Sequence, residues 1–380
     1  MARDTQRFAI SHSAPGTQRE VIVHSYNKGH GGKIAYLQGA LHADETPALL
    51  VLHHLTQLLD EADAKGQVLG EIRLVPYANP IGLSQFLNGH HMGRYELSKG
   101  ENFNRGWPNL SYGLVGRMRG QLGDNEAANV VTIRAALRDA VSGLPVHSEL
   151  QSLQKILASQ AVEADYVWDL HCDNESLMHI YLIPSLWPKG ADLAAELACY
   201  AVLLAADSGG GPFDECFTTP WTKLQGAYPD HPIPTACFGT TIELRGQADV
   251  SDDLARQDAR ALFRSLQREG LVEGDPGPSP EPKCEATDLT GCQIVHAPAS
   301  GIVAYEVGVG DQLKKGQTIA WIVDPSHDQP QEGRHEVISQ TDGLLLARSD
   351  RRYVAAGESL GKVVGREALE GREMGSLLEP

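Results

Sequence analysis

The chain has 380 residues, 42% of them hydrophobic, which is enough to build a substantial core in two or more domains. Its net charge of -17 repels phosphate backbones, and no basic stripe with interleaved aromatics is present, so nucleic acid is not an expected partner. No apolar run reaches the roughly 20 residues of a membrane span, so we expect no membrane partner either.

The first residues and the cysteines favour a cytoplasmic protein. Residues 1–7 lack the long apolar core of a signal peptide. Six cysteines scattered over the chain are typical of reduced thiols. We therefore expect a cytoplasmic location, and the sequence leaves a homo-oligomer open.

The first predicted strand and helix enclose two potential metal ligands. Residues 34–37 form an apolar run that predicts a buried strand, and an apolar helix follows. His42 and Glu45 lie between them at H-x-x-E spacing, where open α/β sheets place their sites. Imidazole and carboxylate are typical ligands of a catalytic zinc. The alternative is a plain helix start in which Asp44 or Thr46 caps the helix and His42 is incidental.

A polar loop further along contains candidate substrate-binding residues. Arg94 lies in G-R-Y, and Asn104 and Arg105 lie in N-F-N-R-G-W-P. Arginine is the side chain best shaped to bind a carboxylate through two parallel hydrogen bonds, and a neighbouring asparagine adds a neutral donor. Taken alone, the pattern also fits an ordinary surface arginine.

A second buried strand is predicted over residues 164–170 and leads into His171. Acids on both sides of this histidine can orient its second ring nitrogen. Cys172 is a conceivable thiolate ligand, but alternation along the strand points its side chain away from that of His171. We expect a buried, inert cysteine.

A further strand, predicted over residues 235–242, leads into Glu243. Burial of an unpaired carboxylate is unfavourable, so Glu243 needs a partner or a chemical role. An ion pair with Arg245 is the structural explanation, and a general base beside a metal-activated water is the functional one. The residues alone leave both open.

Taken in order, H-A-D-E, N-F-N-R-G-W-P, W-D-L-H-C-D and T-I-E-L-R-G resemble the motifs of the succinylglutamate desuccinylase/aspartoacylase family, a branch of the zinc carboxypeptidase superfamily. The resemblance spans roughly residues 30–250. It implies an α/β fold with a zinc-carboxypeptidase-like mixed sheet flanked by helices. It also implies a zinc-dependent hydrolase that cleaves the amide bond of an N-acylated amino acid or a related small N-acyl compound.

The resemblance further implies roles for individual residues, with one zinc ion per chain. The implied residues are the zinc ligands His42, Glu45 and His171, the general base Glu243, and the substrate-binding residues Asn104, Arg105 and Arg94. Arg94 is also the candidate for stabilising the oxyanion. The stretch between Arg94 and Asn104 is longer than in aspartoacylase, which leaves the role of Arg94 open. The usual D-L-N-R is N-F-N-R here, which removes an acid near Arg105 and leaves substrate preference open.

A proline-rich segment, G-D-P-G-P-S-P-E-P, predicts a stiff linker. We therefore divide the chain into a zinc-dependent catalytic domain (1–273), a linker (274–289) and a small all-β domain (290–380). The last part repeats short β runs with glycine turns, from about residue 294 and again from about residue 338. This duplication resembles the biotinyl/lipoyl carrier fold, a barrel-sandwich.

Other functions remain as alternatives. A carrier is disfavoured because residues 321–328, between the two halves, contain no lysine to modify. Two further alternatives are a metallocarboxypeptidase that acts on peptides and a catalytically inactive binding protein. A β domain that narrows the pocket mouth favours small substrates, and relatives with this layout include enzymes acting on N-acetylated diamino acids. The sequence does not tell whether His179, Tyr228 or Arg245 line the pocket.

Overall fold

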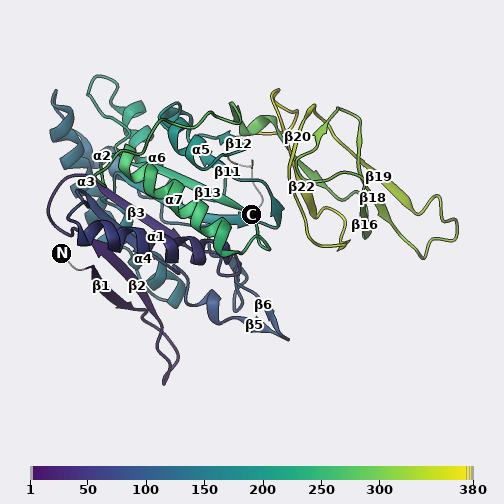
Figure 1. Ribbon diagram of the computed structural model, residues 1–380, viewed down its shortest axis with the longest axis horizontal. Coiled ribbons are helices and arrows are strands. Elements are labelled where there is room, and N and C mark those ends of the chain that lie inside the picture. The colour runs from purple at the N-terminus through teal and green to yellow at the C-terminus, as the bar shows by residue number, and fades with distance from the viewer. Residues whose placement is uncertain (1–2, 374, 376, 378–380) are drawn as a thin grey trace.

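A mixed sheet of nine strands forms the centre of the computed structural model, which describes residues 3–373, 375 and 377 (Figure 1). The predicted strands are confirmed, although the third begins and ends later than expected. In spatial order the sheet consists of β1 (Asp4–Ala9), β2 (Glu20–Tyr26), β4 (Glu71–Val75), β3 (Ile34–Gly39), β9 (Tyr166–Asp173), β13 (Phe238–Gly246), β11 (His179–Leu182), β12 (Ala201–Leu204) and β14 (Ala286–Asp288).

Helices cover both faces of this sheet and bury two separate apolar clusters. On one face lie α1 (Pro47–Ala64), α5 (Ala191–Glu196) and α7 (Asp252–Arg268). On the other lie α2 (Leu114–Met118), α3 (Glu126–Ser142), α4 (Glu149–Ala161) and α6 (Phe213–Ala227). Every helix in the described ranges is too short or too polar to span a bilayer.

Three neighbouring strands bring distant parts of the chain to one edge. β9 runs parallel to β3 on one side and to β13 on the other, with Gly39 opposite Leu170 and Glu243 opposite His171. Because the strands are parallel, their carboxyl ends lie at the same edge of the sheet. The segments after β3 and the last residues of β9 and β13 therefore lie side by side.

The C-terminal strands β15 to β22 form two small sheets, which we call the β unit (residues 292–365). One sheet contains β15 (Cys292–His296), β22 (Ser359–Gly365), β20 (Gly343–Arg348), β17 (Gln312–Leu313) and β10 (Glu175–Ser176). The other contains β16 (Gly301–Tyr305), β18 (Thr318–Val323), β19 (Arg334–Ile338) and β21 (Tyr353–Val354). A separate apolar cluster fills the space between them.

Short elements complete the chain. They are the hairpin β5 (Phe86–Leu87) and β6 (His90–His91), the hairpin β7 (Tyr95–Glu96) and β8 (Glu101–Asn102), and the 3-10 turns Gly82–Ser84, Pro184–Leu186 and Leu289–Gly291. β14 lies within the predicted linker 274–289 but pairs with β12 in the large sheet. The division at 273 and 290 stays a prediction, and the outermost residues of its terminal ranges (1–2, 374, 376 and 378–380) lie outside the described residues.

Candidate metal centre and surrounding pocket

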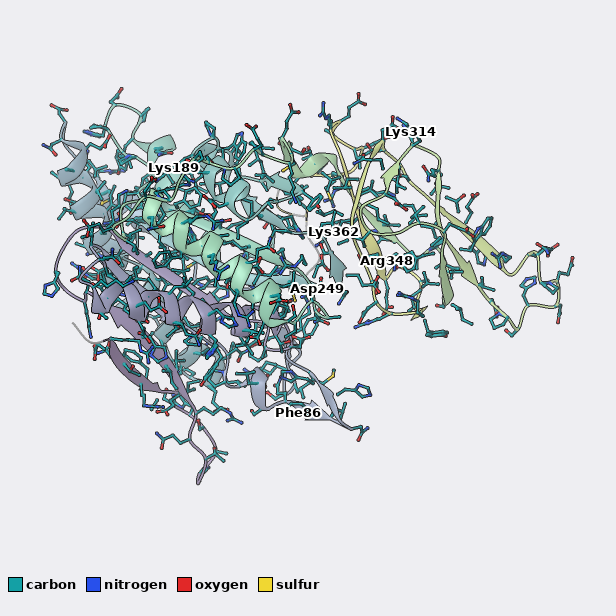
Figure 2. The ribbon with its side chains drawn as sticks, viewed as in Figure 1. Phe86, Lys189, Asp249, Lys314, Arg348 and Lys362 are labelled. Carbon is teal, nitrogen blue, oxygen red and sulfur yellow. The ribbon has the colours of Figure 1, made fainter. Side chains whose placement is uncertain are left out.

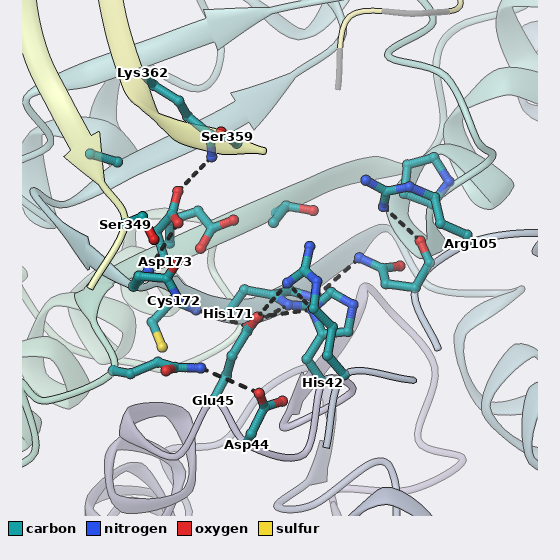
Figure 3. Close-up of a pocket in the computed structure, with 18 of the residues that line it drawn as sticks. His42, Asp44, Glu45, Arg105, His171, Cys172, Asp173, Ser349, Ser359 and Lys362 are labelled. Carbon is teal, nitrogen blue, oxygen red and sulfur yellow. Dashed lines mark hydrogen bonds and ion pairs between the residues drawn. The ribbon is translucent and has the colours of Figure 1, made fainter. Parts of the chain in front are cut away.

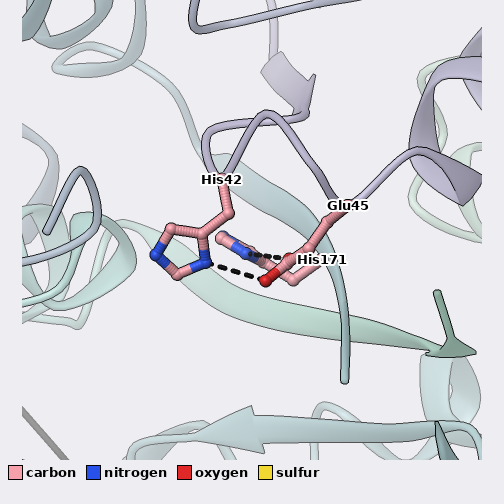
Figure 4. Close-up of side chains that lie close together, drawn as sticks. All are labelled: His42, Glu45 and His171. Atoms are coloured by element: carbon pink, nitrogen blue, oxygen red, sulfur yellow. Dashed lines mark hydrogen bonds and ion pairs between the residues drawn. The ribbon is translucent and has the colours of Figure 1, made fainter. Parts of the chain in front are cut away.

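Three potential metal ligands meet where β3 and β9 end. His42 and Glu45 come from the turn between β3 and α1, and His171 belongs to the end of β9. One ligand atom of each lies within 4.8 Å of the others, and all three residues are buried (Figure 4). The fold thus brings together the three predicted ligands.

Close backbone packing shapes the turn between β3 and α1. Ala40 has φ of +56°, in the left-handed region, which turns the chain sharply at the strand end. The N–H of Ala43 donates to the carbonyl of Gly93 at 3.0 Å. A Cβ at position 93 would lie 2.1 Å from the backbone nitrogen of Asp44, so only glycine permits this approach. Arg94, the next residue, is thereby placed beside the turn.

The Glu45 side chain belongs to a cluster of polar groups and does not cap the helix. Thr46 occupies the N-cap position of α1, but its side chain makes no capping hydrogen bond. Oε1 of Glu45 lies 2.9 Å from Nδ1 of His42, and Oε2 lies 2.8 Å from Nδ1 of His171. Oε2 also accepts the N–H of Cys172 at 3.1 Å. The simple helix-start explanation therefore does not account for this segment.

Asn102 fixes the ring of His42. Its side-chain oxygen accepts the backbone N–H of Asn104 at 2.9 Å and lies 2.8 Å from Nε2 of His42. Because this oxygen is an acceptor, Nε2 carries the proton and Nδ1 presents a lone pair to Glu45. Burial, followed by the charge of Arg94, lowers the pKa of His42, which keeps the ring neutral.

A buried chain of hydrogen bonds holds His171. Its Nε2 lies 2.9 Å from Oδ2 of Asp169, and Oδ1 of Asp169 accepts from Nε2 of Gln38 at 2.9 Å. The hydroxyl of Tyr36 in turn donates to Oε1 of Gln38 at 2.6 Å. Burial alone would lower the pKa of His171, but the carboxylates of Asp169 and Glu45 raise it well above its ordinary value. An acid beside His171 therefore orients the ring, as the sequence suggests.

The donor set fits a divalent cation. Nδ1 of neutral His42 and Oε1 of Glu45 both carry lone pairs, yet they lie 2.9 Å apart. Among the described residues, Nη1 of Arg94 approaches both of these atoms, at 3.2 Å each. A cation held by these ligands and His171 would remove the repulsion. Two imidazoles and one carboxylate, with one position left open, are the ligands of many catalytic zinc ions.

Glu243 lies on β13, directly beside His171 in the sheet register. Its Oε2 is buried and has no hydrogen-bond partner among the described residues. Burial, together with the charge of Glu45, raises the pKa of Glu243 to about 7. Arg245 is not its partner, because the guanidinium of Arg245 donates to both oxygens of Asp258, at 3.1 and 2.5 Å. The structural explanation, an ion pair between Glu243 and Arg245, is therefore excluded.

Arg94, Asn104 and Arg105 all line the same pocket. Nη1 of Arg105 donates to the carbonyl of Asn104 at 2.9 Å. The side chain of Arg105 passes over Gly210, where a Cβ would lie 2.4 Å from its Cδ. The glycine run around residue 210 therefore provides the surface against which Arg105 packs.

The amide of Asn104 lies between the potential metal ligands and α6. Its Oδ1 accepts the N–H of Phe213 at 2.8 Å, and its Nδ2 lies 3.3 Å from Nε2 of His171. Asn104 is buried, and its amide lies between the ring of His171 and the first residue of α6. It lies in the pocket wall next to Arg105.

The pocket has a volume of about 1080 Å³ and is lined by both the large sheet and the β unit. Figure 3 shows Lys362, Ser349 and Ser359 on one side and Arg105 on the other. Nζ of Lys362 donates to Oδ2 of Asp173 at 2.5 Å. No local sequence signal points to this contact, because its two residues are 189 positions apart.

The three residues left open by the sequence lie outside the pocket lining. His179 is buried, with Nδ1 2.8 Å from the carbonyl of Leu177. The hydroxyl of Tyr228 donates to the carbonyl of Val115 at 2.5 Å. Arg245 forms an ion pair with Asp258 of α7, as described above. None of these residues belongs to the candidate site.

Comparison with known proteins shows that the chain matches the model of one protein family. A model of the succinylglutamate desuccinylase/aspartoacylase catalytic domain matches residues 31–268. The matched range contains His42, Glu45, His171 and Glu243 as well as Arg94, Asn104 and Arg105. A search of curated proteins gives no significant match.

Solved structures share the fold over nearly the whole chain. A succinylglutamate desuccinylase/aspartoacylase family protein from Shewanella amazonensis is 24% identical with a TM-score of 0.81, covering 95% of this chain and 98% of that one. A similar protein from Shewanella frigidimarina is 23% identical with a TM-score of 0.83, covering 96% and 97%. The product-bound ectoine utilization protein EutE (DoeB) from Ruegeria pomeroyi is 16% identical with a TM-score of 0.66, covering 96% and 95%.

Proposed function

This chain belongs to the succinylglutamate desuccinylase/aspartoacylase family, whose members are acyl-amino acid hydrolases, and we propose that it is a zinc-dependent deacylase. The substrate would be an N-acylated amino acid or a related small N-acyl compound, cleaved at its linear amide bond. One observation carries the proposal. His42, Glu45 and His171 converge beside Glu243, whose buried Oε2 has no partner among the described residues.

The proposed cofactor is one zinc ion per chain. His42 and His171 would bind it through their Nδ1 atoms, because the other ring nitrogen of each is held by Asn102 and Asp169 respectively. Glu45 would supply the third ligand. When bound, zinc lowers the pKa of a coordinated water to about 7 and polarises the scissile carbonyl.

Glu243 would act as the general base and then as the general acid. It would accept a proton from the attacking water at Oε2 and deliver it to the leaving nitrogen. Its pKa of about 7 suits a group that both takes and gives a proton near neutral pH. Burial beside His171 supports this role because it holds the carboxylate in one place.

The arginines would bind and polarise the substrate. Arg105 would hold the substrate carboxylate, with Asn104 as a neighbouring neutral donor. Arg94 would stabilise the developing oxyanion, since its guanidinium lies 3.2 Å from the Glu45 carboxylate and therefore next to the reacting centre.

We propose a structural role for the β unit, with a barrel-sandwich fold attached to a zinc-carboxypeptidase-like sheet. Its residues line the pocket, which favours small substrates over peptides. The connection between β18 and β19, residues 324–333, contains no lysine, which argues against a biotinyl or lipoyl carrier. Intact-mass measurement checks this directly, because a carrier would show the mass of an adduct.

An activity screen tests the proposed function. Zinc-loaded protein would be incubated with N-acetyl and N-succinyl amino acids, and with N-acetylated diamino acids because one structural neighbour is an ectoine utilization protein. We expect release of the free amine from one group of substrates and none after removal of zinc by a chelator. Release of C-terminal residues from peptides, without deacylation, would replace the proposal with a carboxypeptidase.

A further inference from the structure

Lys362 is a largely buried cation that reaches from β22 of the β unit into the pocket (Figures 2 and 3). Its side chain is only 19% exposed. Nζ donates to Oδ2 of Asp173 at 2.5 Å and to the hydroxyl of Tyr181 at 3.2 Å. Burial opposes the charge of Lys362, but the negative charges around it, that of Asp173 first, raise its pKa well above the ordinary value. Lys362 is therefore an ammonium ion at neutral pH.

The β unit is docked against the catalytic sheet around this contact. β10 follows β9 directly and pairs with β20, where Glu175 lies opposite Arg348. The Glu175 carboxylate accepts from Arg348, and from Arg352 at 3.0 Å. The N–H of Leu177 donates to the carbonyl of Leu346 at 3.1 Å. These bonds fix the position from which Lys362 enters the pocket.

Two carboxylates share the corner that Lys362 enters. Asp173 is two positions after His171 on β9, so its side chain projects from the same face of the sheet. Glu243 is opposite His171 on the neighbouring strand and also lines the pocket. Two carboxylates that line one pocket from adjacent strands repel each other unless a cation compensates them. Lys362 is the cation that binds one of the two.

We propose that Lys362 is a positioning residue for Glu243. By binding Asp173 it holds that carboxylate away from Glu243, so that Oε2 of Glu243 stays directed at the reacting water. This inference rests on the proposed role of Glu243 as the general base. It gives the β unit a part in the reaction itself, beyond narrowing the pocket.

Substitution of the lysine and of its partner tests the proposal. Lys362→Met removes the ammonium group and should lower kcat roughly 10-fold to 100-fold, the range of coupling within one buried network, with KM and zinc content unchanged. Adding Asp173→Asn should restore kcat to within a few-fold of the wild type, because no unpaired carboxylate remains. Lys362→Arg, which keeps the charge, should retain most of the activity and serves if the methionine variant does not fold.

The matched control is Lys314→Met in the same β unit (Figure 2). Lys314 is 81% exposed and pairs with the exposed Asp342 at 3.3 Å, so its removal should leave kcat unchanged. Crystal structures of Lys362→Met and of the double variant with Asp173→Asn report the orientation of Glu243 without any substrate. We expect Glu243 to turn away in the first and to return in the second.

Three outcomes would overturn the proposal. They are an unchanged Glu243 orientation in Lys362→Met, a double variant as slow as the single one, and a rise in KM alone, which would make Lys362 a substrate-binding residue. Failure of the proposed function looks different. The wild-type protein would then hydrolyse no N-acyl amino acid, while the crystallographic comparison would still decide the role of Lys362.

Discussion

Oε2 of Glu45 lies 2.8 Å from Nδ1 of His171, although 126 positions separate the two residues. The distance is short because β3 and β9 are parallel neighbours and both end at the same edge of the sheet. Each of the three proposed ligands is also held by a hydrogen bond to another residue. The site therefore depends on the pairing of two strands as much as on the three ligands.

Loss of one ligand should empty the site. His171→Ala is expected to bind far less zinc than the wild type, because two protein ligands remain where a catalytic zinc needs three. Metal analysis of the purified variant measures this. The control is His54→Ala, because His54 lies on α1 and pairs with the exposed Asp252 at 2.8 Å. Full zinc retention by His171→Ala would remove His171 from the site.

Glu243→Gln should keep both zinc and fold while losing about 10²–10⁴ in kcat, the usual contribution of a general base. The amide has nearly the same shape but cannot accept the proton from water. Turnover, zinc content and melting temperature are measured on one preparation.

Asp258→Asn provides the contrast to Glu243→Gln. It removes the buried partner of Arg245 and should lower the free energy of unfolding by about 3 kcal/mol, with turnover close to that of the wild type. If Glu243→Gln instead lost stability and kept its turnover, Glu243 would be a structural residue.

Arg105→Lys should raise KM for substrates that carry a carboxylate. Lysine keeps the charge but cannot form two parallel hydrogen bonds in one plane. The penalty should be much smaller for the matching amide, and the difference should be about 1.5–3 kcal/mol, the scale of one charge-assisted hydrogen bond. Equal penalties on both substrates would make Arg105 structural and shift the carboxylate site to Arg94.

Gly210→Ala should have the same effect as Arg105→Lys, by a different route. The new Cβ would lie 2.4 Å from Cδ of Arg105 and displace it. Gly211→Ala is the matched control, because φ is positive at both positions but a Cβ at 211 comes no closer than 3.9 Å to its neighbours. Both variants should lose about 1 kcal/mol of stability from backbone strain, and only Gly210→Ala should raise KM.

Asn102→Ala should weaken zinc binding about 10-fold to 100-fold, the usual effect of removing a group that orients a metal-bound histidine. Nε2 of His42 would lose its acceptor, so Nδ1 would no longer be held toward the metal. Competition with a chelator measures the affinity. Asn109→Ala, in the nearby exposed loop, should bind zinc as the wild type does.

The three strands that lead to His42, His171 and Glu243 could be predicted from the sequence because each is a mostly apolar or β-branched run typical of a central strand. The H-x-x-E turn was recognisable for the same reason, since it follows such a run directly. Arg245 could not be assigned locally. Its φ of +64° breaks the alternation of side chains along β13, so the direction of its side chain does not follow from the strand pattern. Its partner Asp258 lies on the helix α7.

Contacts between distant segments account for most of what the sequence did not predict. Asn102 was visible inside N-F-N-R, but its bond to His42 spans 60 positions and depends on how the loop folds back. β10 has only two residues, too few to show a strand pattern, and it joins a sheet whose other strands come more than a hundred residues later. Lys362 sits in a glycine-flanked strand where nothing distinguishes it from a surface lysine.

The contacts that β10 and Asp173 make with the β unit also affect when the site can be completed during synthesis. Asp173 leaves the ribosome 189 positions before its partner Lys362. At roughly 5–20 residues per second, the acidic corner beside the metal ligands stays without its cation for about 10–40 s. During that interval the edge of β10 is also unpaired. We therefore expect a nascent chain stalled before residue 362 to be a good substrate for chaperones and a poor enzyme, even with every proposed metal ligand already synthesised.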